Sequence, residues 1–482
     1  MNVAIASVGF ITAQGSVSDM MSGRPLRLPC ALPWPAERWT TCRHAYRAVD
    51  AEPLLTGKKR WRALAEQALR DCFNGELPSS ETPLLIASCN GAAAGFEADS
   101  WRCAFDSKAL LEGTPWAKAG LPVFSGSCNS GMHALYLARQ LLLAGYSNEI
   151  VVLAVDILSP ASHDNFESLR VLTEKPAPWQ SNSSGFITGE AAVALRLVRT
   201  ERETGAPCLD GPVMGSDLAG YDALSAVLSD LQPLRPGLIL GQGTGPFQSD
   251  ELELCALRAN INEDVPLATP LMCFGHTLGA SSLLSVALGK LLLGSPVPIP
   301  ALLRQSPSAL DGRPLYHGSA AVVGESVLVT CRALNGACAA ASLGAAREPR
   351  AHPVRSWHRA GEHGPLMHSA LRQIAVEAPR YRPPSPPDIL MVRMDEPLTP
   401  HPQASIGGRL LPSAVLEMTP GFVPQLIARC WGFTGASLCL VGGVDTDRAV
   451  HEMIEACKAN ALCVSRVNLL GGADNSGIEW DT

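Results

Sequence analysis

The chain has 482 residues, of which 46% are hydrophobic and 17% charged, with a formal net charge of −7. A chain of this length exceeds one typical domain, and its dispersed acidic charge argues against nucleic-acid binding and gives no reason to expect a membrane partner. Its 15 cysteines show neither paired metal spacing nor a secretory signal, so we expect reduced thiols in the cytoplasm and neither a metal nor a cofactor.

Short apolar segments alternate with Ala- and Leu-rich segments from residue 1 to about 345, which is typical of an α/β fold with buried sheets. Residues 1–12 lack a basic region and contain Gly9, so they are predicted as a buried strand and not as a signal peptide. Residues 279–298 contain Lys290 and end in prolines, which predicts a core helix and not a membrane span. The clearest predicted strands are 2–8, 83–88, 149–155, 191–197, 237–240 and 326–330.

Cys128 follows an apolar run and precedes a helical pattern. Apolar residues recur three and four positions apart at Leu135, Ala138, Leu141 and Leu142. A helix start offers free N–H groups and a partial positive charge, both of which favour thiolate over thiol. Small residues on both sides of Cys128 leave room for an acyl group. This setting favours a nucleophile, whereas a buried structural thiol is the usual role of an isolated cysteine.

Two later glycine-rich turns can complete a site around this thiol. Gln242-Gly-Thr-Gly follows a predicted strand and precedes an acidic helix start with Asp250 and Glu253. Gly275-His276-Thr opens the long apolar helix. Each turn alone is weak evidence, and a capped helix start is the alternative for His276. Together they form the kind of set that a Cys nucleophile requires.

In order and spacing, these motifs resemble the β-ketoacyl synthase (ketosynthase) family of the thiolase superfamily over residues 1 to about 345. The matching segments are the nucleophile loop at 126–131, a Gly-Glu strand entry at 185–192, the first histidine motif at 242–246, the second at 275–277, and a worn glycine-rich turn at 334–338. The resemblance implies a thiolase-like α/β fold with a five-layered α-β-α-β-α core, built from two similar halves at about 1–200 and 201–345.

The resemblance also implies the chemistry. Cys128 accepts an acyl group from an acyl carrier protein thioester and condenses it with a malonyl thioester in fatty-acid, polyketide or polyene synthesis. The implied catalytic residues are Cys128, His276 and Gln242, and the implied supporting residues are Leu334, Thr244, Asp250 and Glu253. The expected oxyanion donors are the N–H of Cys128 and one near Leu334. The expected partners are an acyl carrier protein, which the basic run ending at Arg60 can contact, and a second subunit in a homodimer or heterodimer.

The departures from the family affect the decarboxylation half of the reaction. Gln242 replaces a histidine; its amide can donate a hydrogen bond but cannot transfer a proton at neutral pH. Leu271 replaces a lysine. Three hypotheses remain open: a condensing enzyme with a Cys-Gln-His site, a transacylase that does not condense, and a non-catalytic partner of the chain-length-factor type. A thiolase would need a second reactive thiol in a glycine-rich C-terminal turn; Cys331 and Cys338 lie near this turn, but the glycine cluster is missing.

The rest of the chain divides into two parts. Residues 346–387 have the polar, proline-rich composition of a linker, although 365–378 can form a helix. In residues 388–482, aligning Ala449 with Ala134 places Gly443 opposite Cys128. We interpret this segment as a partial ketosynthase-like N-terminal half without a nucleophile that packs on the first domain or extends a dimer interface. An unrelated α/β appendage is the alternative.

Overall fold

The computed structural model contains one large mixed sheet that positions every predicted motif. Within the described residues, fourteen strands follow the order β11-β10-β14-β15-β9-β1-β8-β6-β4-β5-β19-β16-β20-β21. The structure describes the chain except for residues 35–40, 50–54, 95–99, 102, 202–204, 219–221, 233–234, 298–308, 311–312, 317–321, 323, 347–356, 362, 364, 367, 399–404, 407–408, 411, 471–476 and 482.

The first half of the ketosynthase-like region contributes five strands of this sheet. From β1 outward, β1–β8 and β8–β6 pair antiparallel, and β6–β4 and β4–β5 pair parallel. Its strands are β1 (Asn2–Ile11), β4 (Leu84–Ala87), β5 (Val123–Phe124), β6 (Glu149–Asp156) and β8 (Ala191–Thr200), and its helices are α1 (Val17–Met21), α2 (Gly57–Cys72), α4 (Ser107–Leu110), η1 (Ser127–Asn129), α5 (Ser130–Leu143) and α6 (Pro160–Ser168). The short strands β2 (Cys30–Ala31), β3 (His44–Tyr46) and β7 (Thr188–Gly189) form a small separate sheet.

The second half repeats this pattern. From β9 outward, β9–β15 and β15–β14 pair antiparallel, and β14–β10 and β10–β11 pair parallel. Its strands are β9 (Cys208–Ser216), β10 (Pro236–Leu240), β11 (Leu267–Ala268), β14 (Ser326–Arg332) and β15 (Ala337–Gly344), its helices are α7 (Ala223–Leu231), α8 (Phe247–Asn260), α9 (Leu271–Phe274), η2 (Leu278–Ala280) and α10 (Ser281–Gly294), and β12 (Ala309–Leu310) and β13 (Arg313–Pro314) form a hairpin. The halves meet where β1 pairs with β9.

Three apolar cores separate five layers. The central core encloses α5 and α10, which pack between the sheets of both halves. Most residues of these two helices are buried. A second core covers the opposite face of the first sheet with α2, and a third covers the opposite face of the second sheet with α7 and α8. These layers give the thiolase-like five-layered fold that the sequence predicts.

The predicted elements of this region are confirmed. All six predicted strands are present, and the predicted core helix is α10. In the described part of the chain, no helix has both the length and the apolar character needed to cross a bilayer.

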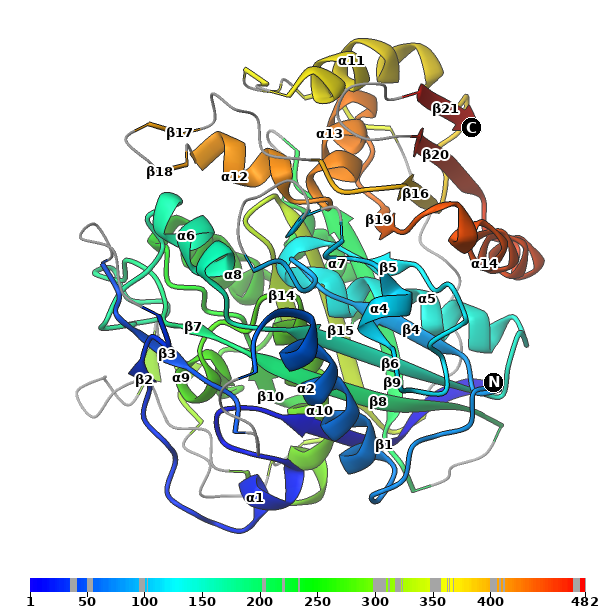
Figure 1. Cartoon of the computed structure of the whole chain (residues 1–482). Coiled ribbons are helices and arrows are strands. Elements are labelled where there is room, and N and C mark those ends of the chain that lie inside the picture. Colours follow the sequence, from blue (N-terminus) through cyan, green and yellow to red (C-terminus); the bar gives the residue numbers. More distant parts are fainter. Residues whose placement is uncertain are drawn as a thin grey trace.

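The C-terminal elements extend the same sheet beyond β5. Figure 1 shows them, in yellow to dark red, gathered on one side of the body formed by the two halves. The predicted helix at 365–378 is α11, whereas residues 347–356 of the predicted linker lie outside the described residues. The elements are α11 (Ser369–Glu377), η3 (Ala378–Tyr381), β16 (Ile389–Met394), β17 (Ser405–Ile406), β18 (Arg409–Leu410), α12 (Pro412–Met418), α13 (Phe422–Trp431), β19 (Ala436–Val441), η4 (Val444–Thr446), α14 (Asp447–Ala459), β20 (Val464–Leu470) and β21 (Gly477–Asp481).

Candidate active site

Cys128 lies in η1, the tight turn between β5 and α5, where the sequence predicts a strand-to-helix turn. The residue before it, Ser127, adopts a left-handed conformation with φ of 58°, which costs energy for a residue with a side chain and is often found at active sites. In the second half, Leu278 has φ of 50° in η2, the equivalent turn before α10. The two halves therefore use the same strained turn to begin their central helices.

The thiol of Cys128 is buried, with 4% of the residue exposed. Burial raises its pKa to about 12, and the nearby carboxylate of Asp156 acts in the same direction. Hydrogen bonds from the backbone of Cys128 and Leu334 act in the opposite direction. The sequence-based expectation that the helix start favours the thiolate is therefore wrong for the free protein, because desolvation outweighs the backbone donors.

Leu334 nevertheless lies where the sequence places it. It belongs to the turn between β14 and β15, which is closed by the bond from Gly336 N to Ala333 O at 3.0 Å. Its backbone and that of Cys128 both interact with the Cys128 sulfur, so two N–H groups converge beside the thiol. Two convergent donors of this kind can stabilise a thioester oxyanion.

Asp156, at the end of β6, is a site residue that the sequence did not single out. It accepts hydrogen bonds from Ser88 Oγ at 2.8 Å, Cys89 N at 3.0 Å and Asn90 N at 3.3 Å. Burial raises its pKa to about 7 despite these bonds. Asp156 thereby holds the loop after β4 next to the nucleophile turn.

His276 is a neutral hydrogen-bond donor at the bottom of the site. Its Nδ1 accepts a bond from Leu278 N at 3.2 Å, which leaves the proton on Nε2, and Nε2 is buried without a hydrogen-bond partner. Phe186 stacks on the ring with centroids 4.3 Å apart, and Phe166 contacts it edge-on at 5.2 Å. Burial lowers the pKa of His276 to about 4, so the imidazole is uncharged at neutral pH.

Residues 185–192, which resemble the Gly-Glu strand entry of the family, position His276. His276 N donates to Ile187 O at 2.8 Å, and Gly189 N donates to His276 O at 2.9 Å. A side-chain carbon at Gly189 would lie 2.0 Å from the carbonyl oxygen of Phe274, so only glycine allows this approach.

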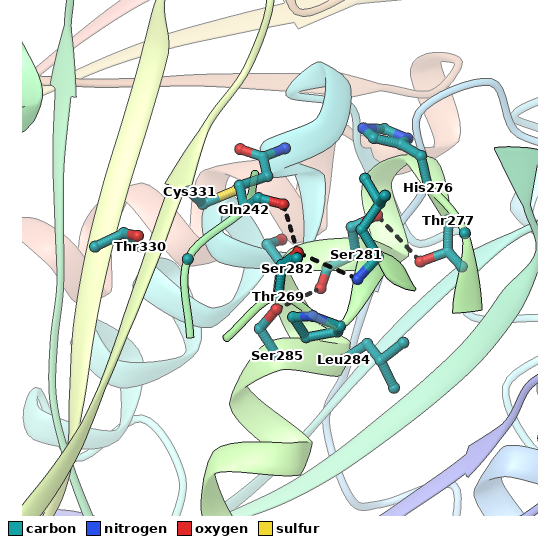
Figure 2. A pocket seen from close by; sticks show the side chains of 14 residues that line it. Gln242, Thr269, His276, Thr277, Ser281, Ser282, Leu284, Ser285, Thr330 and Cys331 are labelled. Carbon is teal, nitrogen blue, oxygen red and sulfur yellow. Dashed lines mark hydrogen bonds between the residues drawn. The ribbon is translucent and has the colours of Figure 1, made fainter. Parts of the chain in front are cut away.

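Gln242 presents the second unpartnered donor. Its Oε1 accepts a hydrogen bond from Arg332 N, which orients the amide, and its Nε2 is buried without a partner. Gln242 and His276 line the same pocket, with Leu271 and Cys331 also in its wall. In Figure 2 the two side chains extend toward the same side of this pocket. Two neutral N–H donors are therefore available to one bound group.

Asp250 and Glu253 both bind the turn that carries Gln242. Glu253 accepts bonds from Gln242 N at 2.9 Å and Gly243 N at 3.0 Å, as well as from the side chains of Trp179 and Thr330. Both carboxylates are buried in α8. Their bonds to backbone N–H groups take the place of the lysine partner that the family resemblance would supply.

Asp250 accepts bonds from Trp179 N at 2.6 Å and Gly245 N at 3.0 Å. Burial raises its pKa to about 7, and Glu253 adds to this shift. Thr244 lies in the same turn and donates to Asp250 at 3.5 Å, so it supports the turn and does not line the pocket of Gln242 and His276.

The nucleophile and the two donors occupy adjacent pockets. Cys128 lines a cavity together with Leu334 and Phe166. Phe166 also contacts the His276 ring, and Cys331, in the wall of the Gln242 pocket, donates to Asn129 next to Cys128. The structure thus brings together the residues that the sequence assigns to acyl transfer and to condensation.

One other sequence interpretation changes, and the structure places two further thiols. Arg60 is not part of an exposed basic patch, because its guanidinium is buried and donates to the Glu190 carboxylate at 3.0 Å. Cys338 packs in the core beneath α7 and α8, away from Cys128, whereas Cys331 lies beside the site with its pKa raised by burial. Sequence spacing does not reveal either arrangement, because the contacting residues are far apart along the chain.

Comparisons with known proteins relate one segment of this chain to the beta-ketoacyl synthases. The model of the beta-ketoacyl synthase N-terminal domain matches residues 121–203, which contain Cys128. A highly reducing polyketide synthase (alnA) of Emericella nidulans is 26% identical over 187 residues; the match covers 33% of this chain but only 8% of that protein. Residues 121–203 of this chain therefore resemble the N-terminal domain of beta-ketoacyl synthases.

Solved structures show how far the shared fold extends. A beta-ketoacyl synthase from Burkholderia phymatum STM815 has a TM-score of 0.58 and 20% identity, and the match covers 72% of this chain and all of that one. The PfaC ketosynthase–chain length factor has a TM-score of 0.67 and 12% identity, and the match covers 97% of this chain and 74% of that one. The larger coverage indicates that the C-terminal residues of this chain also have structural counterparts in the second protein.

Proposed function

We propose that this protein is a ketosynthase-like acyltransferase. It accepts an acyl group on Cys128 from an acyl carrier protein thioester and condenses it with a malonyl thioester. The observation that carries the proposal is the pair of buried, unpartnered donors, Gln242 Nε2 and His276 Nε2, in one pocket beside the nucleophile cavity. Unpartnered buried donors are costly, and a ligand oxygen would satisfy both.

Acyl transfer uses the nucleophile turn. The Cys128 thiolate attacks the thioester carbonyl carbon, and the oxyanion accepts hydrogen bonds from the N–H groups of Cys128 and Leu334. The intermediate then releases the carrier thiolate, which takes up the proton that left the Cys128 thiol. Because burial raises the pKa of Cys128 to about 12 in the free protein, only a small fraction of the molecules carry the thiolate before the thioester binds.

Condensation uses the two donors. The malonyl thioester loses carbon dioxide when the bond between the carboxyl carbon and the α-carbon breaks, and its electron pair forms an enolate. Gln242 and His276 donate to the enolate oxygen, which requires no proton transfer from either side chain. The enolate carbon attacks the acyl carbonyl carbon, and the carbon–sulfur bond to Cys128 breaks to regenerate the thiolate.

A transacylase without condensation is the second candidate. Gln242 replaces a histidine and Leu271 replaces a lysine of the family resemblance, and Leu271 lies buried in the wall of the donor pocket. A non-catalytic partner of the chain-length-factor type is the third, and the solved relatives include ApeO of Xenorhabdus doucetiae in complex with its chain length factor ApeC. The presence of Cys128 in a complete nucleophile turn favours the first two candidates over this one.

Mass spectrometry of the intact protein after incubation with an acyl carrier thioester tests acyl transfer. We expect one acyl adduct on the wild-type chain, none on Cys128→Ala, and an unchanged adduct on Cys255→Ser, which removes an exposed thiol as a matched control. Absence of the adduct on the wild-type chain would leave only the non-catalytic partner.

Release of carbon dioxide from a malonyl carrier thioester then separates condensation from transacylation. Removing one oxyanion donor typically lowers a rate by about 10²–10³-fold, so Gln242→Leu should reduce release by this factor and leave the acyl adduct intact. Gln242→His should raise release. Acylation without any carbon dioxide release or 3-oxoacyl product would favour the transacylase.

The proposal includes an acyl carrier protein as the thioester donor. In one solved relative, AntDE:AntF, a type II polyketide acyl-carrier protein is bound to its ketosynthase, and this chain shares 17% identity with that structure at a TM-score of 0.58. A cytoplasmic location is part of the same proposal, and the 15 free cysteines are compatible with a reducing compartment.

A further inference from the structure

The strands of the C-terminal segment repeat the strand pattern of the first half. β19–β16 and β16–β20 pair parallel, and β20–β21 pair antiparallel. In the first half, β5–β4 and β4–β6 pair parallel, and β6–β8 pair antiparallel. α14 connects β19 to β20 as α5 connects β5 to β6. The segment therefore reproduces four of the five strands of the first half.

The sequence alignment and the structural repeat have the same register. When Ala449 is aligned with Ala134, Val464 at the start of β20 falls on Glu149 at the start of β6. The same alignment places Gly443 opposite Cys128. The internal copy thus keeps the architecture of the first half but carries no nucleophile.

The copy is joined to the first half through equivalent strands. β19 pairs antiparallel with β5, with Val441 opposite Val123 and Leu440 opposite Phe124, and Ser125 N donates to Cys439 O at 3.0 Å. Antiparallel pairing of two equivalent edge strands is the arrangement of a two-fold symmetric interface. It also covers the edge of β5 that would otherwise remain free to pair with another chain.

The equivalent helices also meet. α14 packs against α5, where Asn460 Nδ2 donates to Gln140 Oε1 at 3.2 Å. Lys108 forms an ion pair with Asp445 at 2.6 Å across the same boundary. Apolar side chains of both parts share the core that α2 and α13 cover. The segment is therefore built into the fold along the whole edge.

The same segment contributes to the cavity beside Cys128. Val415, Leu416 and Thr419, in α12 and just after it, line this cavity together with Cys128. Asn335 Nδ2 donates both to Ser127 Oγ at 3.0 Å and to Gly421 O at 3.1 Å, which links the nucleophile turn to the start of α13. Part of the wall of the cavity beside Cys128 thus belongs to the C-terminal segment of the same chain.

We propose that residues 388–482 are an internal, truncated partner subunit. They occupy the β5 edge in place of a second chain, and their residues Val415 and Leu416 limit the length of the acyl group on Cys128. The part concerning the acyl group rests on the proposed function. Because Val415 and Leu416 are apolar, the part of the wall that they form suits an aliphatic acyl chain and not a charged group.

Sedimentation equilibrium of the full chain tests the first part. We expect the mass of one chain, 50.9 kDa, at micromolar concentration, because the pairing edge is already occupied. A mass of two chains would overturn the internal-partner assignment and restore the homodimer expected from the sequence.

Alkylation of the full chain with N-alkyl iodoacetamides of increasing alkyl length tests the second part. We expect Leu416→Phe to reduce the ratio of long-chain to short-chain labelling of Cys128 at least tenfold, and Leu416→Ala to raise it. Val376→Phe introduces the same phenyl side chain at an exposed position outside the cavity and should leave the ratio unchanged. An unchanged ratio in both Leu416 variants, with a wild-type melting temperature, would overturn the assignment.

This readout does not depend on acyl transfer. A protein that shows the expected labelling ratios but forms no adduct from a carrier thioester would contradict the proposed function. The inference that residues of α12 limit the space beside Cys128 would still hold. A protein that forms the adduct with the same length preference in every variant would contradict only the further inference.

Discussion

Replacing Glu253 by Gln should destabilise the protein and displace Gln242. Glu253 Oε1 accepts from Gln242 N and Thr330 Oγ1, and Oε2 accepts from Gly243 N and Trp179 Nε1. The amide of the variant presents hydrogen atoms where one carboxylate oxygen stood. The less costly orientation puts them at the Oε1 position, because the Thr330 hydroxyl can rotate and accept, whereas both donors at Oε2 can only donate.

In that orientation the buried N–H of Gln242 has no acceptor, which costs about 1–3 kcal/mol, and the remaining bonds lose their charge-assisted character. We therefore expect the free energy of unfolding to fall by about 2–4 kcal/mol. Because the Gln242 backbone is released, carbon dioxide release from a malonyl thioester should fall more than tenfold, while acylation of Cys128 is maintained.

Urea denaturation of the purified variant measures the stability change, and Glu251→Gln provides the matched control. Glu251 lies in the same helix, α8, but is exposed, so its variant should stay within about 0.5 kcal/mol of the wild type. Equal stabilities for the two variants would refute the reasoning that Glu253 holds the turn of Gln242.

Three further predictions concern charge. The rate of alkylation of Cys128 by iodoacetamide should rise about tenfold per pH unit from pH 7 to 9, because burial raises its pKa to about 12. The rate for a free thiol levels off above its ordinary pKa of about 8.5. A plateau in the rate at Cys128 below pH 9 would contradict the burial argument. Arg60→Met should cost about 3 kcal/mol in urea denaturation because it removes the nearer cation from the buried Glu190 carboxylate, which keeps only the more distant Arg47, at 4.0 Å, and backbone N–H groups. The exposed control Lys59→Met should cost less than about 0.5 kcal/mol. Burial lowers the pKa of His276 to about 4 in the native protein, so between pH 6.5 and 4 the unfolded chain binds a proton at this residue that the native chain does not. As the pH is lowered through this range, the free energy of unfolding should therefore decrease by up to about 3 kcal/mol more in the wild type than in His276→Gln. Parallel pH profiles of the two proteins would disprove this.

Local patterns were sufficient to predict the strands, the core helix and the turn at Cys128. Apolar runs of strand length and the three- and four-residue spacing after Cys128 depend only on neighbouring residues. The same holds for the two glycine-rich turns that carry Gln242 and His276. The roles of these residues came from the order of the motifs, since each turn alone is common.

Electrostatics at the site required the folded structure. The helix start at Cys128 favours the thiolate, but the surrounding core removes water from the sulfur and raises its pKa. Arg60 belongs to a basic run in the sequence, but its side chain is buried because its guanidinium pairs with the buried carboxylate of Glu190. Glu190 lies 130 positions further along the chain. Desolvation and long-range pairing depend on residues that only the fold brings together.

The sequence by itself therefore determined the family resemblance, the candidate nucleophile Cys128 and the presence of Gln242 where the family has a histidine, because these are properties of residue identity and order. Tertiary structure alone decided that Glu253 and Asp250 hold the Gln242 turn, that His276 is neutral with its proton on Nε2, and that β19 covers the edge of β5. Each of these depends on the distance between groups that are far apart in the chain, and that distance is set by how the sheets and helices pack.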